Sequence, residues 1–251
     1  MMEQQANRIE RRQCDVLVIG GGPAGCTVAP LLAEQGHRVV MLEKARHPRF
    51  HIGESLLPAN LPLFERMGIA DEVKAIGMLK PGAEFVSPHH DASSVFHFAE
   101  AWDKTMPFAY QVRRDEFDTI LIRNAARQGV EVHEGCKARG VDFLPDRTVL
   151  VRARHDDGSE IEWHARFLVD ASGRDTFLAN RFQIKHRNPR HNSSAIYGHF
   201  AGAKRNPGQA AGNITIFWFE HGWFWFIPMR DDVTSIGMVT WPYYMKTKGE
   251  R

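Results

Sequence analysis

Apolar and polar positions near the beginning of the chain change from a strand pattern to a helix pattern and back. Residues 14–20 form a short run rich in Val, Leu and Ile, which is typical of a buried parallel strand. A helix is expected over residues 24–35, ending at Gly36, and a second strand over residues 37–42, followed by Glu43. This order predicts a strand–helix–strand unit.

Further along the chain, segments with strand periodicity outnumber those with helix periodicity. Helices are expected over residues 63–76, with an interruption at Gly68 left open, and over residues 116–128 after Asp115 as the N-cap. Strands are expected over residues 82–87, 94–98, 110–113, 130–134, 138–143, 148–155, 160–164, 167–170, 194–200, 214–219, 223–227 and 235–240. The last part of the chain is therefore expected to form an antiparallel sheet.

Helix-containing and strand-only segments follow one another in blocks, so we predict an α/β fold with two interleaved parts. A Rossmann-like nucleotide-binding domain is assigned to residues 14–81 and 110–186. An antiparallel, substrate-side sheet is assigned to residues 82–109 and 187–251, and residues 1–13 are expected to form a flexible N-terminal tail.

The composition is that of an ordinary soluble globular protein. Of the 251 residues, 43% are hydrophobic and 25% are charged, and the net charge is +2. This near-neutral balance does not indicate a polyanion-binding surface, so no nucleic-acid partner is expected. No apolar run is long enough to span a membrane, and the polar beginning of the chain lacks the apolar segment of a signal peptide.

Cysteine and histidine positions do not indicate a metal site. Cys14, Cys26 and Cys136 are scattered and form no C-x-x-C motif, so we expect neither zinc nor disulfides, and a cytoplasmic protein. The cluster His89-His90-Asp91 lies in a polar turn and is interpreted as a solvated loop. The basic run of residues 181–191 could contact an acidic carrier protein, but a solvated crossover between the two domains is the favoured interpretation.

A glycine-rich turn lies between the first predicted strand and helix. Gly20, Gly22 and Gly25 form G-x-G-x-x-G, which permits the turn, lets the backbone approach a pyrophosphate and lets the helix pack on the strand. The helix N-terminus offers N–H groups to a phosphate. Glu43 follows about twenty residues later, where a carboxylate can bind both ribose hydroxyls and disfavours NADP.

The glycine motif therefore predicts a dinucleotide site, with an ordinary glycine turn as the alternative, and does not separate FAD from NAD. The residues expected to bind the dinucleotide are Gly20, Gly22, Pro23, Ala24, Gly25, Glu43 and Lys44.

Three later stretches, PRFHIGESLLP, YQVRRDEFD and FLVDASGRD, follow the glycine motif in that order. Together they resemble the flavoprotein family that includes aromatic hydroxylases, geranylgeranyl reductases and flavin-dependent halogenases. The resemblance implies FAD as the cofactor and the aromatic hydroxylase-like FAD fold. It also implies that Arg114 reaches the flavin, that Asp170 lies near the ribose and pyrophosphate, and that Gly53-Glu54-Ser55 passes close to the isoalloxazine ring. The alternatives are a solvated residue at a helix start for Arg114 and a turn-forming side chain for Asp170.

The stretch GWFWFIP matches W-x-W-x-I-P, a pattern associated with flavin-dependent halogenases, through Trp223, Trp225, Ile227 and Pro228. Strand alternation places the two tryptophans and the isoleucine on one face, where they are expected to line a wall for the substrate. The alternative is an aromatic core strand. Geranylgeranyl reductases carry a looser aromatic version, so the pattern favours a halogenase without excluding its relatives.

Lys80, in MLKPGAEF, stands where phenol- and pyrrole-type halogenases place their lysine. By this resemblance it is the expected catalytic residue, because an ammonium can hydrogen-bond hypohalous acid and an amine can form a haloamine. Its position before Pro81 also suits an exposed turn, in which case Lys80 is an ordinary surface lysine.

The resemblance as a whole implies a halogenase that uses FADH2 from a separate flavin reductase, together with O2 and halide. Hypohalous acid would then halogenate an electron-rich aromatic, phenol or pyrrole, either free or bound to a carrier protein. The alternatives are an FAD-dependent monooxygenase or geranylgeranyl-reductase-like enzyme, and a non-catalytic fragment of the FAD fold.

Members of this family continue well beyond the length of this chain. The later G-D motif that completes the pyrophosphate site has no match here. We therefore expect a fold that is incomplete at the C-terminus, an FAD site that retains little cofactor, and an unpaired sheet edge prone to association.

Overall fold

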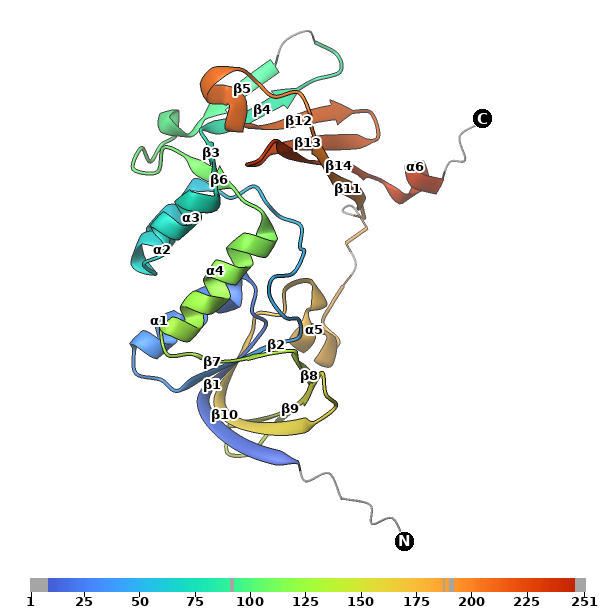
Figure 1. Ribbon diagram of the computed structural model, residues 1–251. Helices are drawn as coiled ribbons and strands as arrows, with labels where there is room; N and C mark the ends of the chain where they lie inside the picture. The colour runs from blue at the N-terminus through green and yellow to red at the C-terminus, as the bar shows by residue number, and fades with distance from the viewer. Residues whose placement is uncertain (1–8, 91–92, 187, 190–191, 247–251) are drawn as a thin grey trace. The chain divides into compact units, whose positions relative to one another are not determined.

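The computed structural model describes residues 9–90, 93–186, 188–189 and 192–246, and its contacts divide the chain into two compact units (Figure 1). The first unit comprises residues 1–50 and 118–185, and the second comprises residues 51–117 and 186–251. Each unit contains one six-stranded sheet.

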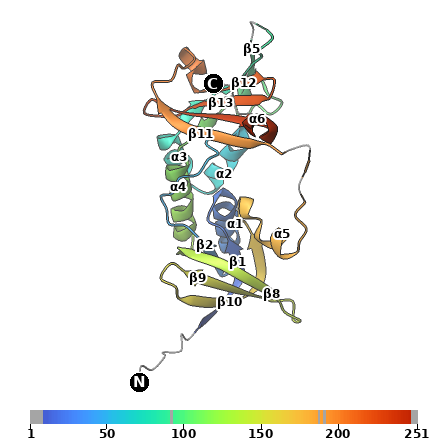
Figure 2. The ribbon, with the colours of Figure 1, turned by 90° about the vertical axis from the view of Figure 1, so that its right-hand side faces the viewer.

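The sheet of the first unit has the strand order β7-β2-β1-β10-β9-β8. Strands β7, β2, β1 and β10 are parallel, whereas β9 and β8 pair antiparallel to β10 and to each other. Figure 2 shows these strands together below helix α1. Their bounds are β1 Glu10–Ile19, β2 Val39–Glu43, β7 Glu131–Glu134, β8 Cys136–Phe143, β9 Val149–His155 and β10 Glu160–Asp170.

Helix α1 (Pro23–Glu34) connects β1 to β2, as expected for a Rossmann-like unit. Helix α4 (Arg114–Arg127) precedes β7, and a short helix α5 (Phe177–Arg181) follows β10. All five residues of β2 are buried, in agreement with the continuous apolar run expected of a strand covered on both faces. Trp163 of β10 is fully buried in the same core.

Two expectations for the first unit are wrong. Residues 10–13 are not part of a tail, because Glu10 to Gln13 pair with Ile161 to His164 as the beginning of β1. The segments 160–164 and 167–170 are not separate strands, because β10 runs without a break from Glu160 to Asp170. In both cases a neighbouring strand supplies backbone partners that the local apolar pattern does not reveal.

The sheet of the second unit has the strand order β11-β14-β13-β12-β4-β5. Its neighbours are antiparallel except β12 with β4, which are parallel and come from distant parts of the chain. The bounds are β4 Gly82–Val86, β5 Ser93–His97, β11 Ser194–Ala201, β12 Ile214–Phe219, β13 Gly222–Pro228 and β14 Val233–Thr240. The predicted antiparallel sheet is therefore present, with one parallel pair inside it.

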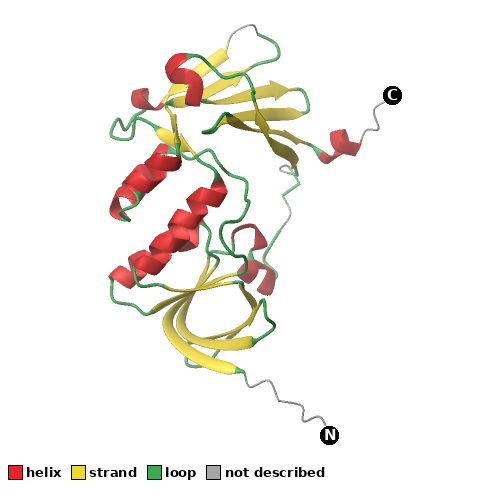
Figure 3. Cartoon of the chain, viewed as in Figure 1, coloured by secondary structure: helices red, strands yellow, loops and turns green. Residues whose placement is uncertain are grey.

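Smaller elements complete the second unit (Figure 3). The predicted helix over residues 63–76 is two helices, α2 (Leu61–Arg66) and α3 (Ala70–Ile76), separated by Gly68 in a left-handed conformation. A two-stranded sheet joins β3 (Met78–Lys80) to β6 (Ala109–Gln111), and α6 (Pro242–Lys246) follows β14. Its short 3₁₀ helices are η1 Pro58–Asn60, η2 Phe98–Glu100 and η4 Gly208–Gly212. A further 3₁₀ helix, η3 Gly173–Asp175, belongs to the first unit.

The contact-based units differ from the boundaries expected from the sequence. Residues 51–81 and 110–117, expected in the nucleotide-binding domain, group with the second sheet. The pairing of β3 with β6, and an isolated bridge from Ser55 to Gln111, join these segments to each other. The functional domain boundaries stay a prediction. In the described part of the chain, no helix combines the length and apolarity needed to cross a membrane.

Candidate functional site

The glycine turn between β1 and α1 is shaped by the packing of the protein itself at two of its positions. Gly20 has φ +107°, and a Cβ there would lie 2.4 Å from the carbonyl oxygen of Ala171. A Cβ on Gly25 would lie 1.9 Å from the carbonyl oxygen of Gly20. Any side chain at either position would therefore collide with backbone, so both glycines are needed to form the turn.

The middle glycine of the motif faces open space instead. The nearest atom to a Cβ on Gly22 would be Nη2 of Arg49, at 3.9 Å. Gly22 is the N-cap of α1, and no side chain caps this helix. Pro23 occupies the first helical position, where the missing N–H costs nothing. An open backbone surface at an uncapped helix N-terminus fits the pyrophosphate of a dinucleotide.

Glu43, at the end of β2, stabilises this turn through hydrogen bonds to backbone N–H groups. Its Oε2 accepts a hydrogen bond from the N–H of Gly21 at 2.7 Å, and its Oε1 accepts one from the N–H of Ala45 at 2.8 Å. The side chain is buried. Each carboxylate oxygen can accept a further hydrogen bond, so the predicted contact with ribose hydroxyls is chemically compatible with this arrangement and stays a prediction.

Arg49 is a candidate that the sequence analysis did not single out. Its Nη1 lies 3.2 Å from Oδ2 of the buried Asp118, and its Nε lies 3.9 Å from Oε1 of Glu43. The guanidinium is thereby held beside Gly22, where a cation suits a phosphate. The available signal was its presence in PRFHIGESLLP, but its partner Asp118 is distant in the sequence.

Two other predicted cofactor residues have partners within the first unit. Lys44 forms an ion pair with Asp175. Asp170, the last residue of β10, accepts hydrogen bonds from the N–H of Ser172 at 3.0 Å and from the N–H of Leu178 at 2.7 Å. Asp170 thus shapes the turn after β10 as the alternative interpretation expected, while its role near the ribose stays a prediction.

In the second unit, Arg114 holds the segment that contains Gly53-Glu54-Ser55. Its Nη1 donates hydrogen bonds to the carbonyl oxygens of Ile52 at 2.9 Å and Gly53 at 3.4 Å. A Cβ on Gly53, which has φ +111°, would lie 2.8 Å from the same nitrogen. Arg114 is buried, so the solvated alternative is wrong. Its predicted contact with the flavin stays a prediction.

Lys80 is buried at the end of β3 and is not an exposed turn residue. Only 3% of its surface is exposed, and its Nζ donates hydrogen bonds to Oγ of Ser55 at 2.8 Å and to the carbonyl oxygen of Leu56 at 2.9 Å. The Phe98 ring lies 5.2 Å from the same nitrogen. Burial disfavours the charged form and lowers the pKa of Lys80 to about 8. A buried amine with this pKa can act as hydrogen-bond donor and as proton donor near neutral pH.

Trp223, Trp225 and Ile227 pack in one cluster on β13, as strand alternation predicted, and their role as a wall for the substrate stays a prediction. Trp225 and Ile227 are buried, Trp223 is half-buried, and the two indole rings have centroids 5.9 Å apart. They pack with Met229 and Ile52, and Pro228 ends the strand. A Cβ on Gly237 of β14 would lie 2.2 Å from the Trp225 ring. Gly237 makes room for the indole because it lacks a side chain, and no sequence pattern marks it, since the contact joins two different strands.

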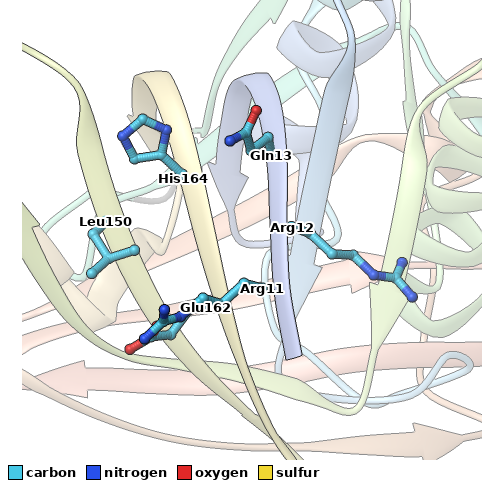
Figure 4. A pocket seen from close by; sticks show the side chains of 6 residues that line it. All are labelled: Arg11, Arg12, Gln13, Leu150, Glu162 and His164. Atoms are coloured by element: carbon cyan, nitrogen blue, oxygen red, sulfur yellow. The ribbon is translucent and has the colours of Figure 1, made fainter. Parts of the chain in front are cut away.

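A pocket of about 350 Å³ lies elsewhere in the first unit (Figure 4). It is lined by Arg11, Arg12, Gln13, Leu150, Glu162 and His164. These residues belong to the amino-terminal half of β1, to its neighbour β10 and to β9, whereas the glycine turn follows the carboxyl end of β1. Because ligands of parallel α/β sheets bind at the carboxyl ends of the strands, we do not assign this pocket to the dinucleotide. Among the described residues, no group of three His, Cys, Asp or Glu side chains could hold a metal ion.

Comparison with known proteins identifies the family. The model of a family described as FAD binding domain matches residues 13–250. The chain belongs to this family. FAD is therefore its cofactor, the predicted fold class is confirmed, and the uncapped helix and open glycine described above fit that cofactor.

Individual relatives of this FAD-binding chain are halogenases. It is 39% identical over 238 residues to "Flavin-dependent halogenase armH3" of Armillaria mellea, covering 90% of the chain and 46% of the relative. It is 32% identical over 249 residues to the "1H-pyrrole-2-carbonyl-[peptidyl-carrier protein] chlorinase" of Pseudomonas fluorescens, covering 90% and 55%. The structure of the myxobacterial chondrochloren halogenase CndH matches with a TM-score of 0.86 and 40% identity, covering 95% and 55%. The predicted resemblance is confirmed, and the chain spans about half the length of the curated relatives it matches.

Proposed function

We propose that this chain is part of a flavin-dependent halogenase that acts on an electron-rich aromatic, either a phenol or a pyrrole. The observation that carries the proposal is the link between the lysine and the tryptophan strand. Ser55 accepts a hydrogen bond from Lys80, and the adjacent Glu54 is joined through Ser235 to Trp225. The names of the relatives support the same activity.

Reduced FAD, when bound, would supply two electrons to O2, which takes two more from the halide, so that one oxygen atom ends in hypohalous acid and the other in water. Lys80 would hold that acid by donating a hydrogen bond from Nζ to its oxygen. In the substitution the aromatic carbon bonds to the halogen, the halogen–oxygen bond breaks, and the oxygen leaves as water after accepting a proton from Lys80. The aromatic carbon loses its proton, and this proton replaces the one that Lys80 donated.

The first unit would bind the cofactor through groups already in place. The N-terminus of α1 and the open face of Gly22 would receive the pyrophosphate, with Arg49 as the nearby cation. Glu43 would bind the ribose, and Asp170 and Lys44 would contribute from neighbouring turns. Arg114 and residues 53–55 would lie towards the flavin ring. The partners we propose are a separate flavin reductase and an aromatic substrate, free or carrier-bound, in the cytoplasm.

The test is mass spectrometry of phenol and pyrrole incubations with FAD, a flavin reductase, NADH and chloride or bromide. It uses the 251-residue chain and any longer product of its reading frame. We expect halogenated products, and about a hundredfold loss or more on Lys80→Ala, because a positioned proton donor contributes on this order. Unchanged halogenation by Lys80→Ala would remove Lys80 from the mechanism.

A second candidate is an FAD-dependent oxidoreductase that hydroxylates an aromatic or reduces double bonds. A structure described as "flavoprotein/dehydrogenase" from Cytophaga hutchinsonii matches with a TM-score of 0.85 and 33% identity, covering 93% of the chain and 57% of that structure. Consumption of NADPH without a partner reductase, together with products lacking halogen, would favour this candidate. Absence of turnover under all conditions would favour a non-catalytic FAD-fold protein.

A further inference from the structure

Glu54 is a buried carboxylate with partners on two strands of the second sheet. It is 1% exposed. Its Oε1 lies 2.7 Å from Nε2 of His199 on β11, and its Oε2 accepts a hydrogen bond from Oγ of Ser235 on β14 at 3.2 Å. Ser235 Oγ in turn accepts a hydrogen bond from the indole Nε1 of Trp225 at 3.1 Å. Glu54 is thus connected to the indole through a single hydroxyl.

The strand register places this network on one face of the sheet. His199 pairs with Ser235, which pairs with Ile227, and in the next row Gly237 lies between Tyr197 and Trp225. Residues in directly opposed positions share a face, and positions two apart along a strand share it too. The indole of Trp225 occupies the space over Gly237, with its ring centroid 6.1 Å from that of Tyr197.

The network fixes the orientation of the Trp225 indole N–H, which packing of the ring alone does not determine. An indole has one polar group, and a buried N–H that lacks an acceptor loses the free energy of a hydrogen bond. The hydroxyl of Ser235 can rotate, but its bond to Glu54 directs its proton away from Trp225 and leaves a lone pair for the indole. Trp225 is thereby fixed, and it packs against the half-buried Trp223.

We propose that Glu54 is a positioning residue, which orients the Trp225 indole through Ser235 and so sets the ring position at which the aromatic substrate is halogenated. His199 holds the other carboxylate oxygen and completes the network. Trp223, the more exposed of the two tryptophans, is the surface against which the substrate ring lies. This inference rests on the proposed function for its effect on products, but not for its effect on the indole.

The proposal differs from a direct role of the Glu54 charge at the flavin. A glutamine at this position keeps a carbonyl oxygen for Ser235 and can donate its amide N–H to Nε2 of a neutral His199. Positioning therefore predicts that Glu54→Gln retains the orientation of Trp225, whereas Glu54→Ala loses it. A charge requirement at the flavin predicts that both variants fail equally.

The first test observes the indole directly in the 251-residue chain. Labelling with ¹⁵N-tryptophan gives indole N–H signals from the six tryptophans, and Trp225→Phe identifies the signal of Trp225. We expect Glu54→Ala to move this signal and to speed its exchange with solvent about tenfold, the loss expected for one hydrogen bond. Glu54→Gln is expected to leave the position and the exchange rate of the Trp225 signal near their wild-type values.

Ser235→Ala tests the same connection in case Glu54→Ala does not fold, because it removes only the hydroxyl that joins Glu54 to Trp225. It is expected to reproduce the change in the Trp225 signal. The matched control is Thr240→Val on the same strand, since Thr240 is equally buried but donates its hydroxyl to the carbonyl oxygen of His221. An unchanged Trp225 signal in Ser235→Ala, or an equal change in Thr240→Val, would overturn the proposal.

The second test measures products in the halogenating protein. Glu54→Ala and Ser235→Ala are expected to change the ratio of halogenated regioisomers and raise KM more than they lower kcat, while Glu54→Gln keeps the wild-type ratio. A wild-type ratio in all variants, or equal losses in Glu54→Gln and Glu54→Ala, contradicts positioning even if halogenation occurs. If no halogenation occurs but the indole responds as expected, the proposed function fails and the positioning of Trp225 stands.

Discussion

At the scale of single residues, Lys80 combines a positive charge with almost complete burial. It has hydrogen-bond acceptors in Ser55 and Leu56, and burial lowers its pKa to about 8 because the buried ammonium loses its hydration. The unfolded chain returns the amine to water, where its pKa is about 10.5. The folded protein therefore loses this proton at a lower pH than the unfolded chain does.

This difference makes the stability of the protein depend on pH. Below about pH 8 Lys80 is charged in both states, and the cost of burying the ammonium is fully present. Between about 8 and 10.5 the unfolded state binds more protons than the folded state, so the free energy of unfolding rises with pH. We expect the wild type to gain up to roughly 3 kcal/mol relative to Lys80→Met between pH 7 and pH 10.5.

Urea denaturation of both proteins across this pH range measures the effect. Lys80→Met lacks the titrating group, and contributions from all other groups cancel in the difference between the two proteins. Parallel stability curves for wild type and Lys80→Met would show that burial does not lower the pKa of Lys80.

At the scale of elements, the β1–α1 turn separates glycines needed by the protein from a glycine available to a ligand. Gly25 abuts the backbone of Gly20, whereas Gly22 faces open space. The same motif therefore contains positions with different tolerance to substitution. The distinction can be tested because stability and FAD affinity are separate measurements.

We expect Gly22→Val to fold with a loss of at most about 1 kcal/mol, the usual effect of a poorer N-cap. Its side chain would occupy the pyrophosphate position, so FAD affinity is expected to fall about tenfold or more, equivalent to about 1.4 kcal/mol. Gly25→Ala is expected to unfold the protein instead, because its Cβ would lie 1.9 Å from a carbonyl oxygen.

Flavin fluorescence titration and thermal unfolding measure these two quantities. Gly22→Ser is the control. Because serine is a good N-cap, its stability is expected to stay near the wild-type value, while its side chain still occupies the pyrophosphate position and lowers FAD affinity. Unchanged FAD affinity in Gly22→Val would place the pyrophosphate elsewhere.

At the scale of the whole molecule, the second sheet ends in two edge strands, β11 and β5. Strand β11 is eight residues long and almost wholly exposed, and its large apolar side chains include Ile196 and Phe200. A long, exposed apolar edge offers unpaired backbone groups to another chain. Strand β11 is therefore an edge at which this sheet could pair with another chain, and association itself stays a prediction.

We expect Ile196→Lys to weaken self-association about tenfold, because a charged side chain on an edge strand opposes pairing with a second edge. Ile196 lies on the face of β11 opposite to His199, so the substitution leaves the Glu54 network untouched. Sedimentation velocity over a range of concentrations measures the effect.

Val95→Lys on the other edge strand, β5, is the matched control and is expected to have less effect because β5 is shorter. Equal effects of the two substitutions would show that β11 is not the preferred edge.

The parts of the site that could be predicted are those encoded locally. The glycine spacing, Glu43 at the end of β2 and the alternation along β13 depend on residues near one another in sequence, so pattern and periodicity suffice. The interpretation of Lys80 as an exposed turn residue failed because burial depends on segments that pack from elsewhere. Its acceptors, Ser55 and Leu56, lie about 25 residues earlier.

The sequence by itself determined the glycine turn, the first strand–helix–strand unit and the aromatic strand, because each follows from backbone preferences and apolar periodicity over a few residues. Only the tertiary structure decided that Glu54 meets His199, 145 residues away, and that Arg49 meets Asp118. Hydrogen bonds and ion pairs act over a few ångströms and depend on strand register and chain path. No local pattern specifies those distances, so the contacts that orient the site emerge only when the chain is folded.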